Sequence, residues 1–355
     1  MSSFYELAEK ALALERSGKK LIKLNVGGTN IPTPQCALDA AIDSIKTSRA
    51  GYGSGAGSQE FRQKIAEREG CEIDNVVVGS GSKQIIYSLL SILCKANDSI
   101  AFPSPYWPAY PLAAKQLGIS CKITKTTMDE RWEFNNLKLD EVKLLILCNP
   151  LNPTSTVYHE ELVNAAIAEA NKKNVPLIID EAYKGLAFNK MPNYEGYENV
   201  IRVRSFSKEF NMEGWRLGYA VAPKEIVKKM VSFNQITTTC TPEFVQRAGI
   251  ACLENEKKIL ESNRKIWQNR AQFATSALKN AGFEFIEPGS GIYIFAKHEK
   301  IKDMDSFSIK LLDEQGVVIA PGSGFGEHQQ FARICLNQKT EVLGEAMAKI
   351  KKQLT

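Results

Sequence analysis

Short apolar, β-rich runs alternate with helical patterns through the middle of this 355-residue chain, and this alternation limits its possible folds more than any other feature. The strand-like runs are almost continuously apolar and cover residues 75–78, 99–102, 143–148, 176–180, 200–204 and 217–221. Between them, residues 82–95 and 159–171 repeat apolar side chains at helical spacing. Apolar strands separated by helices are typical of a mostly parallel sheet covered by helices. The sequence therefore predicts an α/β fold.

The pattern changes after Pro223. A mainly helical stretch runs from Lys224 to about Asn280, and a segment punctuated by Gly and Pro follows at residues 287–291. Further strand-like runs and a final helix from Glu341 complete the chain. This second half is typical of a smaller α+β domain.

The change of pattern predicts a division of the chain into two domains. We expect a large domain over residues 36–270 and a small domain over residues 1–35 and 271–355. The N-terminal helical pattern, Phe4–Arg16, is expected to pack with the small domain.

Composition and charge argue against several classes of function. The apolar fraction of 44% and the charged fraction of 24% are ordinary for a globular protein. The net charge is +5, and no run of like charges is longer than short pairs such as Lys228-Lys229, so nucleic acid is not an expected partner. No apolar stretch is long enough to span a membrane or to serve as a signal peptide. Eight scattered cysteines without a C-x-x-C pair indicate free thiols and a cytoplasmic location.

Polar segments follow several of the predicted strands. Ligands of open α/β sheets bind beyond the carboxyl ends of the strands, so we expect these segments to meet at one rim. They are Gly79-Ser80-Gly81-Ser82-Lys83, Asn149-Pro150-Leu151-Asn152-Pro153-Thr154, Asp180-Glu181-Ala182-Tyr183 and Arg204-Ser205-Phe206-Ser207-Lys208. The first of them opens a predicted helix, where free N–H groups and the helix dipole favour an anion such as phosphate.

Each segment by itself has an ordinary structural explanation. A glycine turn can simply join a strand to a helix, Asn-Pro is common in turns, and a lone lysine is usually a surface group. The chain has no G-x-x-x-x-G-K-[ST] motif, which argues against a Walker-type ATPase. Residues 51–57 lack the G-x-G-x-x-G spacing and a clear preceding strand, which argues against a Rossmann dinucleotide site. The inference therefore depends on the order and spacing of the whole set.

Taken together, the segments resemble the class I/II aminotransferases, which depend on pyridoxal 5′-phosphate (PLP) and have PLP fold type I. Residues 149–154 resemble the motif N-P-x-N-P-T-G, with Ser155 in place of the final glycine, and residues 180–183 resemble D-E-x-Y. Residues 205–208 with 214–219 resemble S-x-S-K…G-x-R-x-G, and residues 321–323 with Arg333 resemble P-G-x…R. The resemblance covers nearly the whole chain. It implies a large domain with a mostly parallel central sheet and a smaller α+β domain.

The resemblance also implies catalytic roles. Lys208 would carry PLP as a Schiff base and, once released, would move the proton between the substrate Cα and the cofactor. Asp180 would pair with the pyridine nitrogen and keep the ring an electron acceptor. Tyr183 and Asn152 would hydrogen-bond the phenolic oxygen of PLP.

Further residues are implied to hold the cofactor. The cofactor phosphate would be bound by the backbone amides around Gly81, Ser82 and Lys83 together with Ser205, Ser207 and Arg216. Trp107 would stack on the pyridine ring. Tyr52 would reach the phosphate of the cofactor in the neighbouring subunit, so a homodimer is expected.

The substrate would be held by its α-carboxylate. Arg333 would grip this group in a two-pronged fork, and the Gly27 amide would add a donor, although residues 26–30 depart from the family's G-E-P-D-F. Trp107 and Asn152 would also border the substrate. This hold favours loss of the Cα proton. The expected reaction moves an amino group from an L-amino acid of aspartate, alanine or aromatic type to a 2-oxo acid.

Three alternatives stay open at the level of sequence. A carbon–sulfur lyase or an amino-acid decarboxylase would keep the same cofactor residues. A histidinol-phosphate-type aminotransferase fits the short chain and the brief link between Arg62 and Val76, whereas residues 105–108 look more like the aspartate, alanine and aromatic subgroup. A non-catalytic scaffold or regulator is opposed by the presence of Lys208, Asp180 and Tyr183. The pattern identifies no cation for the distal carboxylate of an acidic substrate.

Overall fold

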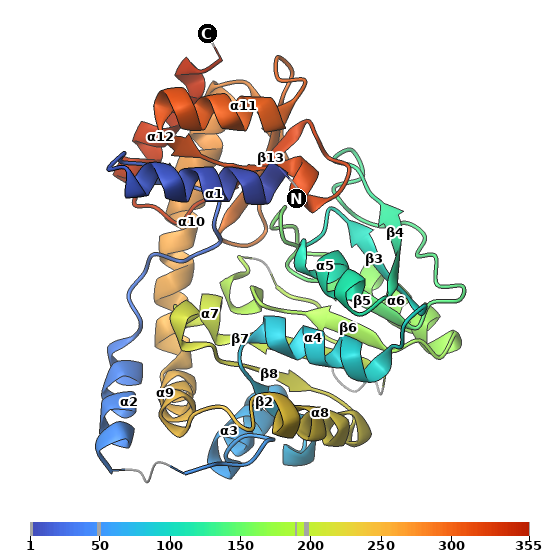
Figure 1. Cartoon of the computed structure of the whole chain (residues 1–355). Coiled ribbons are helices and arrows are strands. Elements are labelled where there is room, and N and C mark those ends of the chain that lie inside the picture. Colours follow the sequence, from blue (N-terminus) through green and yellow to red (C-terminus); the bar gives the residue numbers. More distant parts are fainter. Residues whose placement is uncertain (1–2, 48–50, 189, 195–198, 355) are drawn as a thin grey trace.

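A seven-stranded sheet forms the centre of the chain in this computed structural model, which describes residues 3–47, 51–188, 190–194 and 199–354 (Figure 1). The strand order is β2-β8-β7-β6-β5-β3-β4. The bounds are β2 Val76–Gly79, β3 Ser99–Ser104, β4 Ser120–Lys125, β5 Leu144–Cys148, β6 Leu177–Asp180, β7 Val200–Ser205 and β8 Gly218–Val221. Only β8 runs antiparallel to its neighbours, so the prediction of an α/β fold with a mostly parallel sheet is confirmed.

The sequence analysis did not anticipate β4. Its six residues are all exposed or half-buried, because it is the edge strand and pairs only with β3. Strands that are buried on both faces appear in the sequence as apolar runs, whereas a partly exposed edge strand such as β4 does not.

Helices cover the sheet. The two predicted helices are present as α4 (Ser82–Leu93) and α6 (Glu160–Lys172). In α4 the apolar stripe faces the core, with Ile85, Ile86 and Leu89 all buried. The other helices are α2 Gln35–Thr47, α3 Gln59–Glu69, α5 Ala109–Gln116, α7 Phe206–Glu209, α8 Lys224–Thr237, α9 Glu243–Glu254 and α10 Glu256–Asn280.

The C-terminal part adds a second, smaller sheet in the order β12-β13-β10-β9. Its elements are β9 Phe283–Phe285, β10 Tyr293–His298, β12 Ala320–Pro321 and β13 Phe331–Cys335, with helices α11 Met304–Lys310 and α12 Thr340–Lys352. The pair β1 (Ile22–Lys23) and β11 (Val317–Val318) lies beside it. Helix α1 (Ser3–Arg16) packs here through Leu7 and Ala11, as expected for the N-terminal helix (Figure 1).

Two large hydrophobic clusters support the proposed division into two domains. One surrounds the seven-stranded sheet, and the other lies among α10, α12 and the smaller sheet. We propose to keep the boundary near residue 270, although α10 is continuous through this position and joins the two parts as one helix (Figure 1). Among the described residues, no helix combines the length and the apolar composition needed to cross a membrane.

Candidate active site

A cavity of about 630 Å³ collects almost every residue that the sequence placed at one rim. It lies beyond the carboxyl ends of β5, β6 and β7, where an open α/β sheet binds its ligands. The predicted residues that line it are Gly27, Ser82, Lys83, Trp107, Asn152, Asp180, Tyr183, Ser205, Ser207, Lys208, Arg216 and Arg333. Gly81 stands just behind this lining, and Tyr52 lies outside it with 91% of its surface exposed.

Lys208 projects into the cavity from α7, directly after β7. Its ammonium donates to the Gly27 carbonyl and lies 3.6 Å from Glu213 Oε1. Burial lowers the pKa of Lys208, and the Glu213 carboxylate partly opposes this shift. A lysine with a lowered pKa has a larger fraction of free amine near neutral pH than a surface lysine, so more of it is available as a nucleophile or base.

Asp180 ends β6 at the floor of the cavity and is 3% exposed. Its Oδ2 accepts a hydrogen bond from the Tyr110 hydroxyl at 2.7 Å, and its Oδ1 accepts one from the Ala182 N–H at 3.2 Å. Burial raises the pKa of Asp180 to about 6, against the effect of both hydrogen bonds. Among the described residues no cation pairs with this carboxylate, so it is suited to a cationic group of a ligand.

A chain of hydrogen bonds connects Asn152 to its neighbours in the cavity. Its Nδ2 donates to Tyr183 Oη at 3.3 Å, and its Oδ1 accepts from Arg333 Nη1 at 3.0 Å. The Tyr183 hydroxyl also lies 3.1 Å from the Tyr293 hydroxyl. Burial and the neighbouring Tyr293 raise the pKa of Tyr183 well above its usual value, so its phenol is neutral and can donate. These contacts determine which way the Asn152 amide points.

Arg333 comes from β13 of the smaller sheet and is 4% exposed. Its Nη2 donates to the Asn25 carbonyl at 2.6 Å, and its guanidinium lies 4.3 Å from the ring centre of Tyr293 and 4.6 Å from that of Phe325. Its Nε is buried without a partner, and no carboxylate pairs with it among the described residues. A buried guanidinium held by neutral groups can bind a carboxylate of a ligand.

The N-terminus of α4 and Arg216 form the second cationic side of the cavity. Gly81 precedes the helix with φ of +84°, and a Cβ there would collide with Arg216 Nη2. Arg216 itself donates to two backbone carbonyls, those of Glu213 at 2.8 Å and Ser80 at 3.4 Å. Glycine is therefore required for the arginine to approach the helix N-terminus, and free N–H groups with a guanidinium suit a phosphate.

Trp107 and Lys83 form one wall of the cavity. Lys83 Nζ lies 5.3 Å from the centre of the Trp107 ring, and Trp107 meets Tyr110 edge to face at 5.5 Å. The sequence analysis assigned only the backbone amide of Lys83, to the cofactor phosphate, and the side chain of Lys83 lies at the wall of the cavity. No carboxylate pairs with Lys83 among the described residues.

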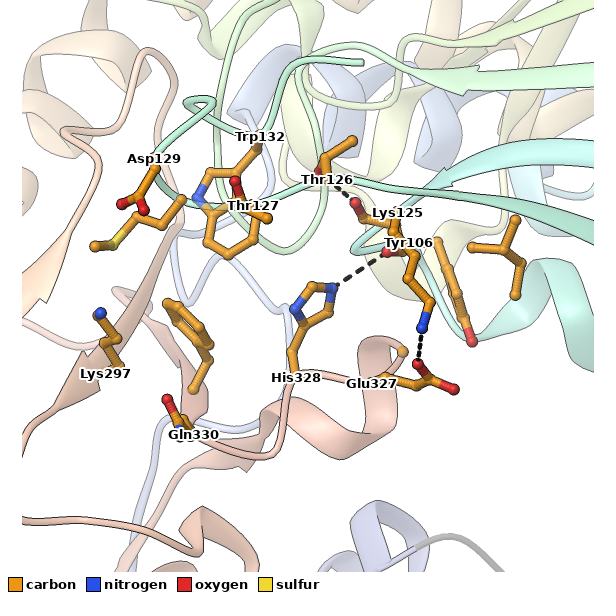
Figure 2. A pocket seen from close by; sticks show the side chains of 15 residues that line it. Tyr106, Lys125, Thr126, Thr127, Asp129, Trp132, Lys297, Glu327, His328 and Gln330 are labelled. Atoms are coloured by element: carbon orange, nitrogen blue, oxygen red, sulfur yellow. Dashed lines mark hydrogen bonds and ion pairs between the residues drawn. The ribbon is translucent and has the colours of Figure 1, made fainter. Parts of the chain in front are cut away.

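A second cavity, of about 430 Å³, lies between the loop after β4 and residues 326–331 (Figure 2). Its walls include four aromatic rings, those of Tyr106, Trp132, His328 and Phe331. Burial lowers the pKa of His328 to about 4, so this ring is neutral, and its Nε2 lies 3.3 Å from Ser104 Oγ. Its two lysines, Lys125 and Lys297, are already paired with Glu327 and Glu284. None of the predicted residues lines this cavity, so we assign the active site to the larger one.

Comparison with known proteins agrees with this arrangement. The sequence model of the family "Aminotransferase class I and II" matches residues 19–350. The chain belongs to this family. This confirms the resemblance that the motifs indicated, and with it an enzyme of the aminotransferase class. The alternative of a non-catalytic scaffold is set aside.

Several relatives of the enzyme are aspartate aminotransferases. The one from Thermococcus kodakarensis is 35% identical over 320 residues, which cover 89% of this chain and 85% of that protein. The crystal structure of the one from Thermotoga maritima is 28% identical and matches with a TM-score of 0.93 over 99% of this chain and 96% of that chain. The Thermus thermophilus enzyme with maleate is 26% identical and has a TM-score of 0.94 over 99% and 97%. PLP fold type I is therefore confirmed.

Three residues at the cavity of the aminotransferase were not found from the sequence. Tyr293 and Glu213 line the cavity, and Tyr110 lies beneath it against Asp180. Glu213 stands three residues before Arg216 of the lysine motif. An acidic residue can be noticed at this position, but the sequence does not tell whether it faces the cavity or the solvent. Tyr293 gives no signal, since its role depends on the approach of β10 to the large sheet.

Proposed function

We propose that this enzyme is a PLP-dependent aminotransferase that takes the amino group of an acidic L-amino acid such as aspartate and passes it to a 2-oxo acid. The observation that carries the proposal is the set of four cations in one cavity, namely Lys83, Lys208, Arg216 and Arg333. Each has a distinct partner on the cofactor or the substrate, and the set leaves one cation for a second carboxylate.

The cavity fits PLP on chemical grounds. The buried Asp180 carboxylate lacks a cationic partner among the described residues, and the protonated pyridine nitrogen would provide one. The α4 N-terminus, Ser205, Ser207 and Arg216 would hold the phosphate. Tyr183 and Asn152 would hydrogen-bond the ring oxygen, and Trp107 would cover the ring face.

The reaction then follows from what the side chains do. When bound, PLP supplies an electron sink for the Cα–H bond of the amino acid. Arg333 holds the α-carboxylate, and the Asn152–Tyr183 hydrogen bond keeps the amide directed at the site. Lys208 Nζ, whose pKa is lowered by burial, would be the base that accepts the Cα proton and, once protonated, the acid that returns it.

Lys83 is the cation left for the side chain of the substrate. Arg216 is directed at the helix N-terminus, Arg333 is bound to Asn152 and Asn25, and Lys208 is the base. Lys83 contacts the Trp107 ring and no carboxylate among the described residues, so its charge is available to a distal carboxylate. The names of the relatives, aspartate aminotransferases, support this substrate class.

A Lys83→Met variant tests the substrate class. A charge-assisted hydrogen bond contributes roughly 1.5–3 kcal/mol, so we expect kcat/KM for aspartate to fall about 10- to 100-fold. The value for alanine should change less than about twofold, because alanine lacks the second carboxylate. The exposed Lys115→Met variant is the control. Equal losses for both amino acids contradict the assignment of Lys83.

The near-ultraviolet and visible spectrum tests the reaction itself. Bound PLP should change its absorbance when aspartate is added and recover when a 2-oxo acid follows. Release of carbon dioxide, ammonia or sulfide without recovery indicates a decarboxylase or a lyase instead. Preference for a phosphate-bearing amine over aspartate would assign Lys83 to a distal phosphate, as in the histidinol-phosphate-type alternative.

We also propose that the enzyme is a homodimer in the cytoplasm. Exposed Ile236 of α8 lies near Tyr52, because residues 53–55 contact the end of α8 and the loop after it, and other exposed apolar side chains stand on α2. Ile42, Ile45 and Ile236 are at least half exposed. Burial of such a face against a second copy is favourable. None of the eight cysteines, all of which lie in the described part of the chain, forms a disulfide, which supports a reducing compartment.

A Tyr52→Phe variant and sedimentation test the dimer. If Tyr52 reaches the neighbouring cofactor, loss of its hydroxyl should weaken PLP binding by about tenfold while the dimer persists. An active, PLP-loaded monomer would refute the proposal.

A further inference from the structure

A cluster of buried charges lies on the face of β7 opposite to the active-site cavity. Ser205 of β7 lines the cavity, so Arg202 and Arg204 point to the other face of the sheet. Arg202, Arg204, Glu69, Glu181 and Glu209 are all less than a tenth exposed.

Both catalytic segments send their next residue into this cluster. Asp180 and Lys208 line the cavity, whereas Glu181 and Glu209, the residues that follow them, are 0% exposed on the opposite side. Arg204 joins the two glutamates. Its Nη2 donates to Glu209 Oε1 at 2.9 Å, and its Nη1 lies 3.9 Å from Glu181 Oε2.

Glu209 also holds the turn that follows Tyr183. Its Oε1 accepts the Gly185 N–H at 2.8 Å, and a Cβ at Gly185 would lie 3.0 Å from the Glu209 carboxylate. Arg68 of α3 donates to Glu209 Oε2 at 3.0 Å. One side chain of α7, the helix that carries Lys208, therefore bonds to the turn that carries Tyr183.

The ionisation of Glu209 agrees with its contacts to two arginines in the cluster. Burial by itself would raise the pKa of Glu209, but Arg204 and Arg68 outweigh this effect and lower it, so the carboxylate stays ionised. Buried ion pairs contribute little net stability compared with a well-packed apolar core. Loss of one partner is costly, however, so the pairs hold the segments in one arrangement. The cluster is therefore better explained by positioning than by stability.

We propose that Glu209, through Arg204 and Glu181, is a positioning residue that sets the place of Lys208 relative to Asp180 and Tyr183. The inference rests on the proposed function, because it concerns the same site. A shift of about 1 Å at a catalytic base can cost about 100-fold in rate, so a small movement of α7 is enough to be measured.

The test compares Glu209→Gln with Arg202→Met in the PLP-loaded enzyme. Glutamine has the shape of glutamate without its charge, so the first variant loosens the bond to Arg204 without removing volume. Arg202 is as buried as Arg204 and pairs with Glu69, and no hydrogen bond or ion pair joins it to α7 or to the turn after Tyr183 among the described residues. Its variant is therefore a matched control for loss of a buried charge.

We expect Glu209→Gln to lower kcat for aspartate by at least about tenfold with KM within about twofold. The pH at which the absorbance of bound PLP changes should also shift, because the surroundings of Lys208 change. Arg202→Met should lose stability and keep both kcat and this pH midpoint. Glu209→Asp keeps the charge, but its shorter side chain does not reach Arg204, so this variant should lower kcat as well. It replaces Glu209→Gln in the test if that variant does not fold.

Two results separate the inference from the proposed function. If the wild-type enzyme does not transaminate aspartate, the proposed function fails first. If the wild-type enzyme is active and both Glu209 variants keep its kcat and pH midpoint, or change them no more than Arg202→Met does, the positioning role is refuted.

Discussion

Asp180→Asn should stabilise the cofactor-free chain while it abolishes catalysis. The Asp180 carboxyl has a pKa of 3.8 in its ordinary state and of about 6 in the folded chain, because burial disfavours its charge. The folded chain thus binds more protons than the unfolded chain between about pH 4 and 6, and stability falls as pH rises through this window. The difference between the two pKa values corresponds to roughly 3 kcal/mol at pH 7. An uncharged asparagine side chain escapes this penalty.

The assay is denaturant unfolding of PLP-free enzyme at several pH values from about 4 to 8. The wild-type midpoint should decline between about pH 4 and 6, whereas the variant should lack this decline and exceed the wild type at pH 7 by up to roughly 3 kcal/mol. Asp140→Asn is the control. The exposed Asp140 carboxylate pairs with Lys173, and this pairing lowers the pKa of Asp140. Loss of the Asp140 charge should therefore not stabilise the folded chain.

Catalysis should respond in the opposite direction. Without the carboxylate the pyridine nitrogen has no anionic partner, so we expect kcat for aspartate to fall by more than about 100-fold. If Asp180→Asn is no more stable than the wild type at pH 7, burial does not destabilise the Asp180 charge as described. If the variant keeps its activity, the carboxylate is not the partner of the cofactor.

Two further predictions concern glycines. Gly27→Ala would place a Cβ on the Tyr293 hydroxyl, so the segment around residue 27 must move. Steady-state kinetics should then show KM for aspartate raised at least about tenfold. An unchanged KM would disprove the close contact. Gly81→Ala would strain a residue with φ of +84° and displace Arg216. Titration with PLP should therefore show binding weakened by at least about tenfold. Equal binding would count against a phosphate site at the α4 N-terminus.

Much of the fold could be predicted from the sequence, because a strand that is buried on both faces appears as a short apolar run. The strands β5 and β6 are fully buried and almost entirely apolar, whereas the fully buried β7 alternates apolar residues with Arg202 and Arg204. The prediction of their parallel order places the carboxyl ends of all three strands at one rim. The edge strand β4 left no such signal. The domain boundary near residue 270 stays a proposal, since α10 crosses it without a break.

The sequence by itself determined which segments meet at the cavity, because the apolar strands and the polar residues after each of them are local properties of the chain. Only the tertiary structure decided which side chains meet within it. Tyr293 reaches Tyr183 from 110 residues away, and Arg68 reaches Glu209 from 141 residues away. Such contacts depend on how α3, β10 and the sheet pack against one another, and no spacing along the chain records that packing.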